Sequence, residues 1–266
     1  MHVIVCVKQV PDPEIPPSKF KIDPVTKQVV PPVGVPSVIS VFDERAVEAA
    51  CRLKDKFKAK ITAITMGSGK VADVIKHAYT MGVDEGAVLQ DKAFENLDGF
   101  GTAYVLSKAI RKIGAYDLIL CGRQAADWDS GQVGSILAEM MSIPIVTIAR
   151  DIKVIDNQLR VERVLRDGYQ VVEVPMPCLI TVSNEIGLPR LPSGMGIITA
   201  ARKKIPVWTA QDIQVDPAQL VSAAGHTEIV NLFVPTRESK VELVTGTNTR
   251  EAAVKLAAKL REANIV

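Results

Sequence analysis

The stretch YDLILCGRQAADWDSGQVGSILAEMM, residues 116–141, contains the pattern that decides the fold. Residues 116–121 read as a buried strand, and the apolar residues of 130–141 recur at the spacing of a helix. A strand that leads into a helix is the repeating unit of a parallel sheet covered by helices. The turn between them, residues 122–134, holds two aspartates, two glutamines, an arginine and three glycines. A turn that only reverses the chain needs far fewer polar residues.

The same alternation of strand and helix runs through the first half of the chain. It predicts strands at 2–10, 60–65, 87–90 and 116–121. It also predicts helices at 43–57, 71–81, 101–113 and 130–141, the first of them capped by Asp43. After residue 143 the pattern predicts strands at 145–155, 159–165 and 169–174, joined by two tight turns. We therefore expect an α/β fold: a Rossmann-like, doubly wound, mainly parallel sheet with an antiparallel extension.

The chain is expected to divide near residue 206. Residues 1–206 carry the α/β pattern, whereas residues 207–266 lack clean periodicity except for a predicted helix at 250–262. A tail of this kind is best explained as a C-terminal arm that lies on another chain. Residues 11–38 are rich in proline and predict a long ordered loop at the carboxyl edge of the sheet.

Composition and charge exclude several classes of protein. The chain has 32 basic and 30 acidic residues, so no nucleic-acid partner is expected. No stretch approaches the ~20 apolar residues that cross a membrane, and the N-terminus lacks the features of a signal peptide. The four cysteines lack the spacing of a metal site, which predicts buried, reduced thiols. We expect a cytoplasmic protein without membrane insertion and without a metal.

Small and polar residues gather in turns that follow or precede the predicted elements. These turns should meet at the carboxyl edge of the sheet, where ligands bind, and they are residues 6–8, 40–43, 66–69 and 122–134. Glycines let a backbone approach a ligand, and free N–H groups at a helix start favour phosphate. A nucleotide at this edge is the natural hypothesis, although the chain has neither a GxGxxG fingerprint nor a P-loop.

The competing interpretation is that these turns only cap their helices. In residues 122–134, Asp129 or Ser130 would be the cap, which leaves Arg123, Gln124, Asp127 and Gln132 without a role. The two aspartates could also form an acid/base pair or a metal site, but no histidine or third acid accompanies them. Nothing in the sequence resembles a Ser-His-Asp set. If the protein is redox-active, its electron carrier must be a bound cofactor.

A second distinctive segment, the docking segment, is residues 181–205. It combines an apolar set with proline and glycine, and it ends in a basic run at 202–204. The apolar set is Ile186, Leu188, Leu191, Met195 and Ile197. Such a segment either packs on its own domain or forms an exposed protein-docking site with a charged rim.

In this order, the motifs resemble those of the beta subunits of electron-transfer flavoproteins. The resemblance covers nearly the whole chain, and the ordered set of motifs carries it rather than any one of them. The matching stretches are VCVKQVPD (5–12), KIDP (21–24), FDERAVEAACRLK (42–54), TMG (65–67), AYTMGVD (78–84), CGRQA (121–125) and residues 184–206.

The resemblance implies a heterodimer of alpha and beta subunits, with FAD held mostly by the alpha subunit and shared with beta. It also implies AMP in the beta subunit, or a second FAD in electron-bifurcating members, and electron exchange with an acyl-CoA-type dehydrogenase. The implied cofactor contacts are Cys6, Val7, Lys8, Ser40, Val41, Phe42, Asp43, Met66, Gly67, Gly122, Arg123, Gln124, Ala125, Asp127, Asp129, Ser130, Gly131, Gln132 and Val133. The implied partner contacts are Ile186, as the apolar anchor, with Leu188, Leu191, Arg202 and Lys203.

Two departures from the family pattern bear on the ligand. Ser40-Val41 stands where the family usually has Asn-Pro, and Trp128 stands where bifurcating members usually have glycine. Three functions stay open at this point: an electron carrier without its own acid/base catalysis, a bifurcating form that oxidises NADH at a beta-bound FAD, and an adenine-nucleotide-binding regulatory module.

Overall fold

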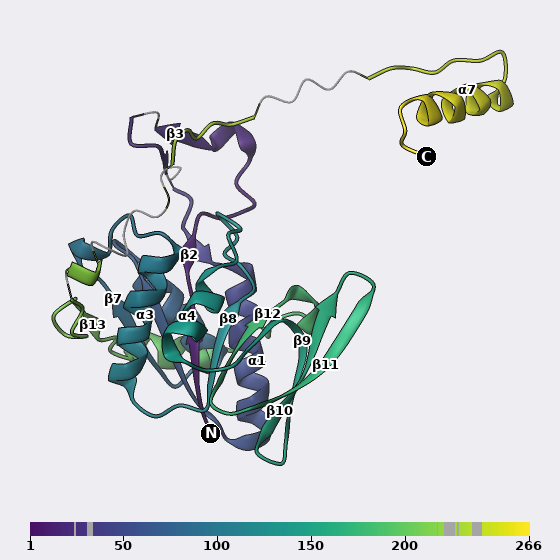
Figure 1. The fold of residues 1–266 in the computed structure, drawn as a ribbon. Coiled ribbons are helices and arrows are strands. Elements are labelled where there is room, and N and C mark those ends of the chain that lie inside the picture. Colours follow the sequence, from purple (N-terminus) through teal and green to yellow (C-terminus); the bar gives the residue numbers. More distant parts are fainter. Residues whose placement is uncertain (24, 31–33, 217, 221–226, 228, 236–240) are drawn as a thin grey trace. The chain divides into compact units, whose positions relative to one another are not determined.

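The computed structural model describes residues 1–266 except 24, 31–33, 217, 221–226, 228 and 236–240 (Figure 1). The chain divides into two compact units, Met1–Val230 and Asn231–Val266, and each is described by itself. The boundary expected at residue 206 is too early, because β13 (Val207–Trp208) still pairs in parallel with β7 (Glu85–Leu89) of the first unit. Pro24 of the KIDP motif and parts of the expected arm lie outside the described residues.

The first unit is built on a nine-stranded sheet with the order β11-β10-β9-β12-β8-β1-β6-β7-β13. Five parallel strands form its centre: β1 (His2–Cys6), β6 (Lys60–Met66), β7, β8 (Leu118–Gly122) and β12 (Cys178–Val182). From β1 the chain moves outward through β6 and β7, and it then returns to place β8 on the other side of β1. The strand order therefore reverses between β1 and β8. Open α/β sheets bind their ligands at this kind of reversal.

Helices cover both faces of the sheet, as expected for a doubly wound fold (Figure 1). Helices α1 (Val41–Phe57), α2 (Ala72–Met81) and α5 (Gly194–Arg202) pack on one face, and α3 (Gly99–Ile113) and α4 (Val133–Met141) pack on the other. Strand β1 shows the cause, because its buried side chains alternate between the two apolar clusters.

The expected antiparallel extension is confirmed. Strand β9 (Ile145–Ile155) runs parallel to β12 and antiparallel to β10 (Gln158–Leu165), which pairs antiparallel with β11 (Gly168–Pro175). Asp156 and Asn157 both have positive φ, 46° and 63°, as a two-residue hairpin turn requires.

The segment between β1 and α1 holds short elements rather than one open loop. Strand β2 (Gln9–Val10) pairs with β5 (Val38–Ile39), and β3 (Lys21–Asp23) pairs with β4 (Gln28–Val30). Three 3-10 turns complete the described elements of this unit: η1 (Pro17–Lys19), η2 (Lys92–Phe94) and η3 (Asn184–Ile186).

Helix α5 was not predicted, because its glycines disfavour a helix by local propensity. The Oγ atom of Ser193 caps the helix by accepting a hydrogen bond from the N–H of Gly196 at 3.0 Å. A Cβ atom at Gly196 would lie 2.4 Å from the carbonyl oxygen of Thr80 in α2. The glycine therefore serves close helix packing, which sequence periodicity does not reveal.

The second unit contains α7 (Thr249–Glu262), which confirms the helix predicted at 250–262. The Asn248 side chain caps this helix by accepting a hydrogen bond from the N–H of Glu251 at 2.9 Å. None of its residues is buried, so its apolar side chains lack a covering layer within the described part of the unit. Among the described residues, no helix combines the length and the hydropathy needed to cross a bilayer.

Candidate functional site

The candidate site lies at the reversal of strand order, and a buried carboxylate joins the two strand ends there. Asp43 Oδ2 accepts a hydrogen bond from the N–H of Lys8, just beyond β1, at 2.9 Å. Its Oδ1 accepts one from the N–H of Gly122, the last residue of β8, at 3.0 Å. The Asp43 residue is only 7% exposed. Its expected role as a helix cap is wrong, because α1 begins after Ser40 and Asp43 lies inside the first turn.

Gly122 makes this contact sterically possible. A Cβ atom at residue 122 would lie 2.4 Å from Asp43 Oδ1 and 2.7 Å from the Cβ of Phe42. The Asp43 carboxylate is a side-chain end, but the Cβ of Phe42 and the backbone nitrogen of Asp43, 2.9 Å from the new Cβ atom, are fixed in the first turn of α1. Glycine at the end of β8 therefore allows α1 to approach the strand reversal closely.

Burial sets the electrostatics of the site. It raises the pKa of Asp43 to about 7, while the backbone N–H groups of Lys8 and Gly122 and the charge of Lys8 oppose the rise. The neighbouring thiols of Cys6 and Cys121 are buried, as expected, and their hydrogen bond together with burial raises the pKa of Cys121. A protonated thiol is a poor nucleophile, so Cys121 is not activated for nucleophilic chemistry.

The first half of the turn is held by side chains just after β1 and just before α1. Lys8 Nζ lies 2.7 Å and 2.9 Å from the two carboxylate oxygens of Asp127. Ser40 Oγ accepts a weak hydrogen bond from the N–H of Ala126 at 3.3 Å. Trp128, which follows Asp127, is half exposed. The structure thus brings together Lys8, Ser40 and Asp127, three of the residues expected to form one site.

The second half of the turn leaves backbone donors free. Asp129 and Gly131 have positive φ, 51° and 62°, and Gln124 Nε2 donates a hydrogen bond to Asp129 Oδ1 at 2.9 Å. Within the described part of the chain, no backbone carbonyl accepts a hydrogen bond from the N–H of Ser130, Gly131 or Gln132. Helix α4 begins only at Val133, so the caps expected at Asp129 and Ser130 are wrong and the N-cap residue is Gln132.

Other expected cofactor residues make their contacts with neighbouring strands and with α1. Arg123 donates its N–H to Val182 at 2.9 Å, and its guanidinium group lies 5.0 Å from the centre of the Phe42 ring. Gly67 donates its N–H to Leu89 of β7 at 3.1 Å, and Met66 is the last residue of β6. The side chains of Cys6 and Val7 are buried, which leaves mainly their backbone for contact with a ligand.

Two residues beside the site were not predicted. Gln9 Nε2 donates a hydrogen bond to the carbonyl oxygen of Lys70 at 3.1 Å and so joins the loop after β1 to the turn before α2. Glu44 in α1 pairs with His77 in α2, with 2.7 Å between Oε1 and Nε2. The only sequence signal for Gln9 was its place next to Lys8 in a motif shared with the family.

The docking segment differs from the expectation at its anchor. Ile186 is only 8% exposed and belongs to the apolar cluster under α1, so the exposed anchor expected there is wrong. Leu188 and Leu191 are 79% and 88% exposed, and Met195 is 73% exposed. The apolar surface of the docking segment is therefore formed by residues that follow Ile186.

The basic end of the docking segment is also divided between two roles. Arg202 is exposed. Lys203 Nζ instead donates hydrogen bonds to the carbonyl oxygens of Val83 and Asp84, at 3.1 Å and 2.7 Å, and lies 4.5 Å from the centre of the Tyr79 ring. Lys203 thus attaches the segment to the α2–β7 connection and is not a free charged rim.

Comparison with known proteins decides the family. A model of the electron transfer flavoprotein domain matches residues 29–213. The electron transfer flavoprotein subunit beta of Thermoanaerobacterium thermosaccharolyticum is 40% identical over the full length of both chains. The chain belongs to the electron transfer flavoprotein beta subunits. The resemblance seen in the sequence motifs is thereby confirmed.

Two further relatives of this beta subunit are similar over their full length. The caffeyl-CoA reductase-Etf complex subunit CarD of Acetobacterium woodii is 38% identical, and the acryloyl-CoA reductase electron transfer subunit gamma of Anaerotignum propionicum is 33% identical. In both cases the match covers 100% of each chain. Family membership places the beta subunit among proteins of flavin-dependent electron transfer.

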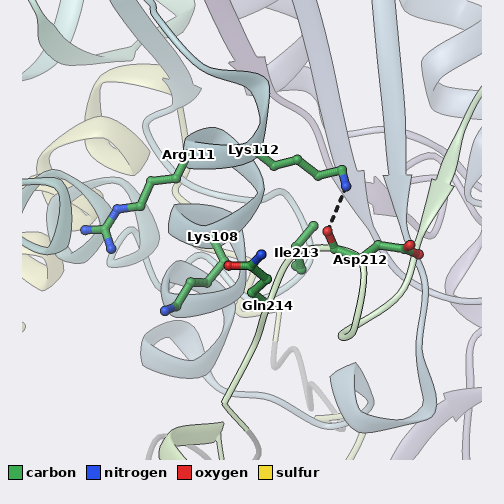
Figure 2. Close-up of a pocket in the computed structure, with 6 residues that line it drawn as sticks. All are labelled: Lys108, Arg111, Lys112, Asp212, Ile213 and Gln214. Atoms are coloured by element: carbon green, nitrogen blue, oxygen red, sulfur yellow. Dashed lines mark hydrogen bonds between the residues drawn. The ribbon is translucent and has the colours of Figure 1, made fainter.

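A cavity of the beta subunit lies away from the strand reversal, between α3 and the segment after β13 (Figure 2). Its volume is about 480 Å³, and basic side chains of α3 form one wall. Lys112 Nζ donates a hydrogen bond to the carbonyl oxygen of Asp212 at 2.7 Å, whereas Lys108 and Arg111 point away from it (Figure 2). Because these cations diverge, the cavity does not form a site for one anion.

Proposed function

We propose that this beta subunit pairs with an alpha subunit and carries electrons through FAD to or from an acyl-CoA-type flavin dehydrogenase. We further propose that it binds AMP or a second FAD at residues 122–133. The observation that most strongly supports this nucleotide site is the contact made by Asp43. Asp43 joins the strand ends at the reversal of sheet order and thereby positions a turn of exposed polar groups over it.

The donor set of the turn suits a phosphate group. Ser130, Gly131 and Gln132 offer N–H groups that no described backbone carbonyl uses, and the N-terminus of α4 follows directly. Helix N-termini favour anions because their first N–H groups lack partners and the helix dipole is positive there. A Cβ atom at Gly131 would meet only ordinary contacts, so its positive φ rather than crowding explains the glycine.

The carboxylates of the turn suit binding rather than proton transfer. Lys8 holds Asp127 and Gln124 holds Asp129, which leaves acceptor oxygens of the kind that ribose hydroxyls use. Bound flavin supplies the electron chemistry, and the side chains of this subunit bind and orient the nucleotide. No acid/base catalysis is assigned to them.

The names of two relatives support a partner that acts on acyl-CoA substrates. Both relatives are named for CoA-ester reductases. We assign docking to the exposed apolar side chains of Leu188, Leu191 and Met195, because clustered exposed apolar side chains mark protein contacts. The uncovered helix α7 is assigned to the alpha subunit, whose surface would bury its apolar side chains.

The test is to purify the beta subunit with its natural partner, release the ligands with acid, and count FAD and AMP per heterodimer. One FAD with one AMP supports the simple electron carrier. Two FAD without AMP support the alternative, in which a beta-bound FAD oxidises NADH. A colourless beta subunit that is stable alone and binds only adenine nucleotides would support a regulatory module and contradict the proposal.

A pair of glycine variants tests the position of the nucleotide. Gly131 and Gly114 both have positive φ, 62° and 98°, and neither is crowded. Changing either to alanine strains the backbone by about 1 kcal/mol. Only Gly131→Ala should lower the nucleotide content of the purified heterodimer. Equal loss in both variants would show that the nucleotide lies elsewhere.

A further inference from the structure

A buried carboxylate in α1 lies under the docking segment. Glu48 is 5% exposed, although its neighbours along this face of α1 are apolar core residues. A buried charge is costly unless it is paired and hydrogen-bonded. Glu48 has two cationic partners, Arg52 in the same helix and Arg190 in the docking segment.

The contact with Arg190 fixes one end of the segment. Arg190 Nε lies 2.8 Å from Glu48 Oε2, and the backbone N–H of Arg190 donates to the same oxygen at 3.0 Å. The Nη2 atom of Arg190 donates to Asp55 Oδ2 at 2.8 Å and, more weakly, to Glu48 Oε1 at 3.4 Å. Backbone and side chain of one residue are therefore held by one carboxylate.

The contact with Arg52 fixes the other end. Arg52 Nε donates to Glu48 Oε1 at 2.9 Å, which orients its guanidinium group toward the docking segment. Its Nη1 and Nη2 atoms then donate to the carbonyl oxygens of Ile186 and Leu188, at 2.7 Å and 3.3 Å. Gly187, between them, has a φ of 107°, and a Cβ atom there would lie 3.3 Å from Arg52 Nη2.

The charges of this Glu48 cluster (Glu48, Arg52, Asp55 and Arg190) balance two against two. Burial alone would raise the pKa of Glu48, but hydrogen bonds from Arg190 and Arg52 outweigh burial and lower it. Glu48 therefore stays ionised and keeps both guanidinium groups in place. Between the two fixed ends, Leu188 is held with its side chain in solvent, and Leu191 follows directly.

We propose that Glu48 is a positioning residue for partner docking. Its carboxylate sets the conformation of residues 186–190 through Arg52 and Arg190, so that Leu188 and Leu191 are presented to an apolar recess of the dehydrogenase. The proposal rests on the proposed function for the identity of the partner. The effect on the conformation of the segment does not depend on that identity.

The test uses the purified heterodimer with Glu48→Gln, which keeps the shape of the side chain and removes its charge. Amide hydrogen exchange of residues 186–191 should become at least about tenfold faster, because the loop opens locally once its ion pairs weaken. With an acyl-CoA dehydrogenase as electron donor, KM for the heterodimer should rise by about tenfold while kcat and flavin content stay unchanged. Unchanged exchange and unchanged KM would overturn the proposal, and so would a loss of flavin.

Two controls separate positioning from general stability. Glu44→Gln makes the same change one turn earlier in α1, where the partner is His77, and should leave the exchange of residues 186–191 unchanged. Arg52→Lys keeps the charge but lacks the planar fork that reaches two carbonyl oxygens, and it should give an intermediate effect. This variant also serves if Glu48→Gln does not fold.

A double-mutant cycle with Leu188→Ala tests whether Glu48 acts through the exposed leucine. If it does, Glu48→Gln should raise KM much less in the Leu188→Ala background than in the wild type. Fully additive effects on KM would contradict positioning of Leu188. If wild-type heterodimer accepts no electrons from any acyl-CoA dehydrogenase, the proposed function fails, whereas the exchange experiment still decides the role of Glu48.

Discussion

The turn 122–133 and the docking segment follow neighbouring strands, β8 and β12, yet they present opposite chemistry. Both are held by α1, but the holding groups differ. Under the turn, the carboxylate of Asp43 accepts hydrogen bonds from backbone N–H groups. Under the docking segment, the guanidinium group of Arg52 donates hydrogen bonds to backbone carbonyl groups.

This difference shows how one helix can prepare two kinds of surface. Asp43 accepts hydrogen bonds from the N–H groups at both strand ends. The turn above them therefore exposes its own N–H donors and carboxylates. Arg52 donates hydrogen bonds to two carbonyl groups of the docking segment, so leucine side chains dominate the exposed surface of that segment. The first arrangement suits a polar ligand, and the second suits an apolar protein surface.

The largest effect is expected from Gly122→Ala. The new methyl group would overlap Asp43 and Phe42, and it would push α1 away from β8. We expect a loss of about 3 kcal/mol or more in the free energy of unfolding and loss of the bound nucleotide. Urea denaturation followed by circular dichroism measures the first effect.

Gly194→Ala is the matched control for this variant. No heavy atom lies within 4 Å of the Cβ position at Gly194, and its φ is not positive. Its unfolding midpoint should match that of the wild type. If Gly122→Ala unfolds no earlier than Gly194→Ala, α1 does not depend on the close contact at β8.

The next effect distinguishes buried from exposed apolar residues in the docking segment. Ile186→Ala creates a cavity in the core and should lower the free energy of unfolding by about 3 kcal/mol. Leu191→Ala removes an exposed side chain and should change it by less than about 0.5 kcal/mol while raising KM for the partner dehydrogenase. Urea denaturation and steady-state electron transfer measure the two effects. A stable Ile186→Ala variant with weak docking would instead restore Ile186 as the anchor.

A smaller effect is expected from Asp43→Asn. An amide leaves one of the two backbone N–H groups without an acceptor, which should cost about 1–2 kcal/mol. The variant should also change how the stability of the protein depends on pH. The pKa of the Asp43 carboxyl is about 7 in the folded chain and 3.8 in the unfolded chain. Such a raised pKa stabilises the folded chain fully below pH 3.8, and this stabilisation is lost as the pH rises through about 7.

The measurement compares thermal midpoints of wild type and Asp43→Asn between pH 5 and pH 8. The destabilisation caused by the variant should therefore shrink as the pH rises across this range. If the difference between the two proteins is independent of pH, Asp43 does not titrate in this window. Asp73→Asn, which affects an exposed ion pair with Lys76, is the control for the same change at the surface.

The smallest effect is expected from Lys8→Gln. Its ion pair with Asp127 is partly exposed, and exposed pairs contribute about 0–1 kcal/mol to stability. Nucleotide affinity should fall more than stability does, because Asp127 then loses the cation that holds it. Equilibrium dialysis of the nucleotide at two salt concentrations checks this, since high salt should reduce the difference between wild type and variant.

Most elements could be predicted from the sequence because their periodicity is set locally. The buried runs of β1, β6 and β8 and the amphipathic patterns of α2, α3 and α7 are of this kind. Helix α5 could not be predicted, because Gly196 disfavours a helix locally and is explained only by its contact with α2. The start of α1 was missed for a related reason, since an aspartate near a helix start resembles a cap whether or not its side chain turns into the core.

The residues of the candidate site could be predicted better than their contacts. The excess of polar groups in residues 122–134 pointed to this turn, and the structure places Lys8, Ser40 and Asp43 beneath it. The burial of Ile186 and the contacts of Lys203 could not be predicted, because exposure depends on the neighbouring helix and not on the residue type. Glu48 and Arg190 lie 142 positions apart, so no local pattern reveals their ion pair.

The sequence by itself determined the family, the alternation of strands and helices, and the polar turn after β8, because all three depend on residue types in a fixed order along the chain. Only the tertiary structure decided which groups meet. In the folded chain, the buried Asp43 is hydrogen-bonded to two strand ends, and the buried Glu48 is the centre of an ion-pair cluster. A buried carboxylate must find partners in three dimensions, and the packing of α1 against β8 and the docking segment supplies them.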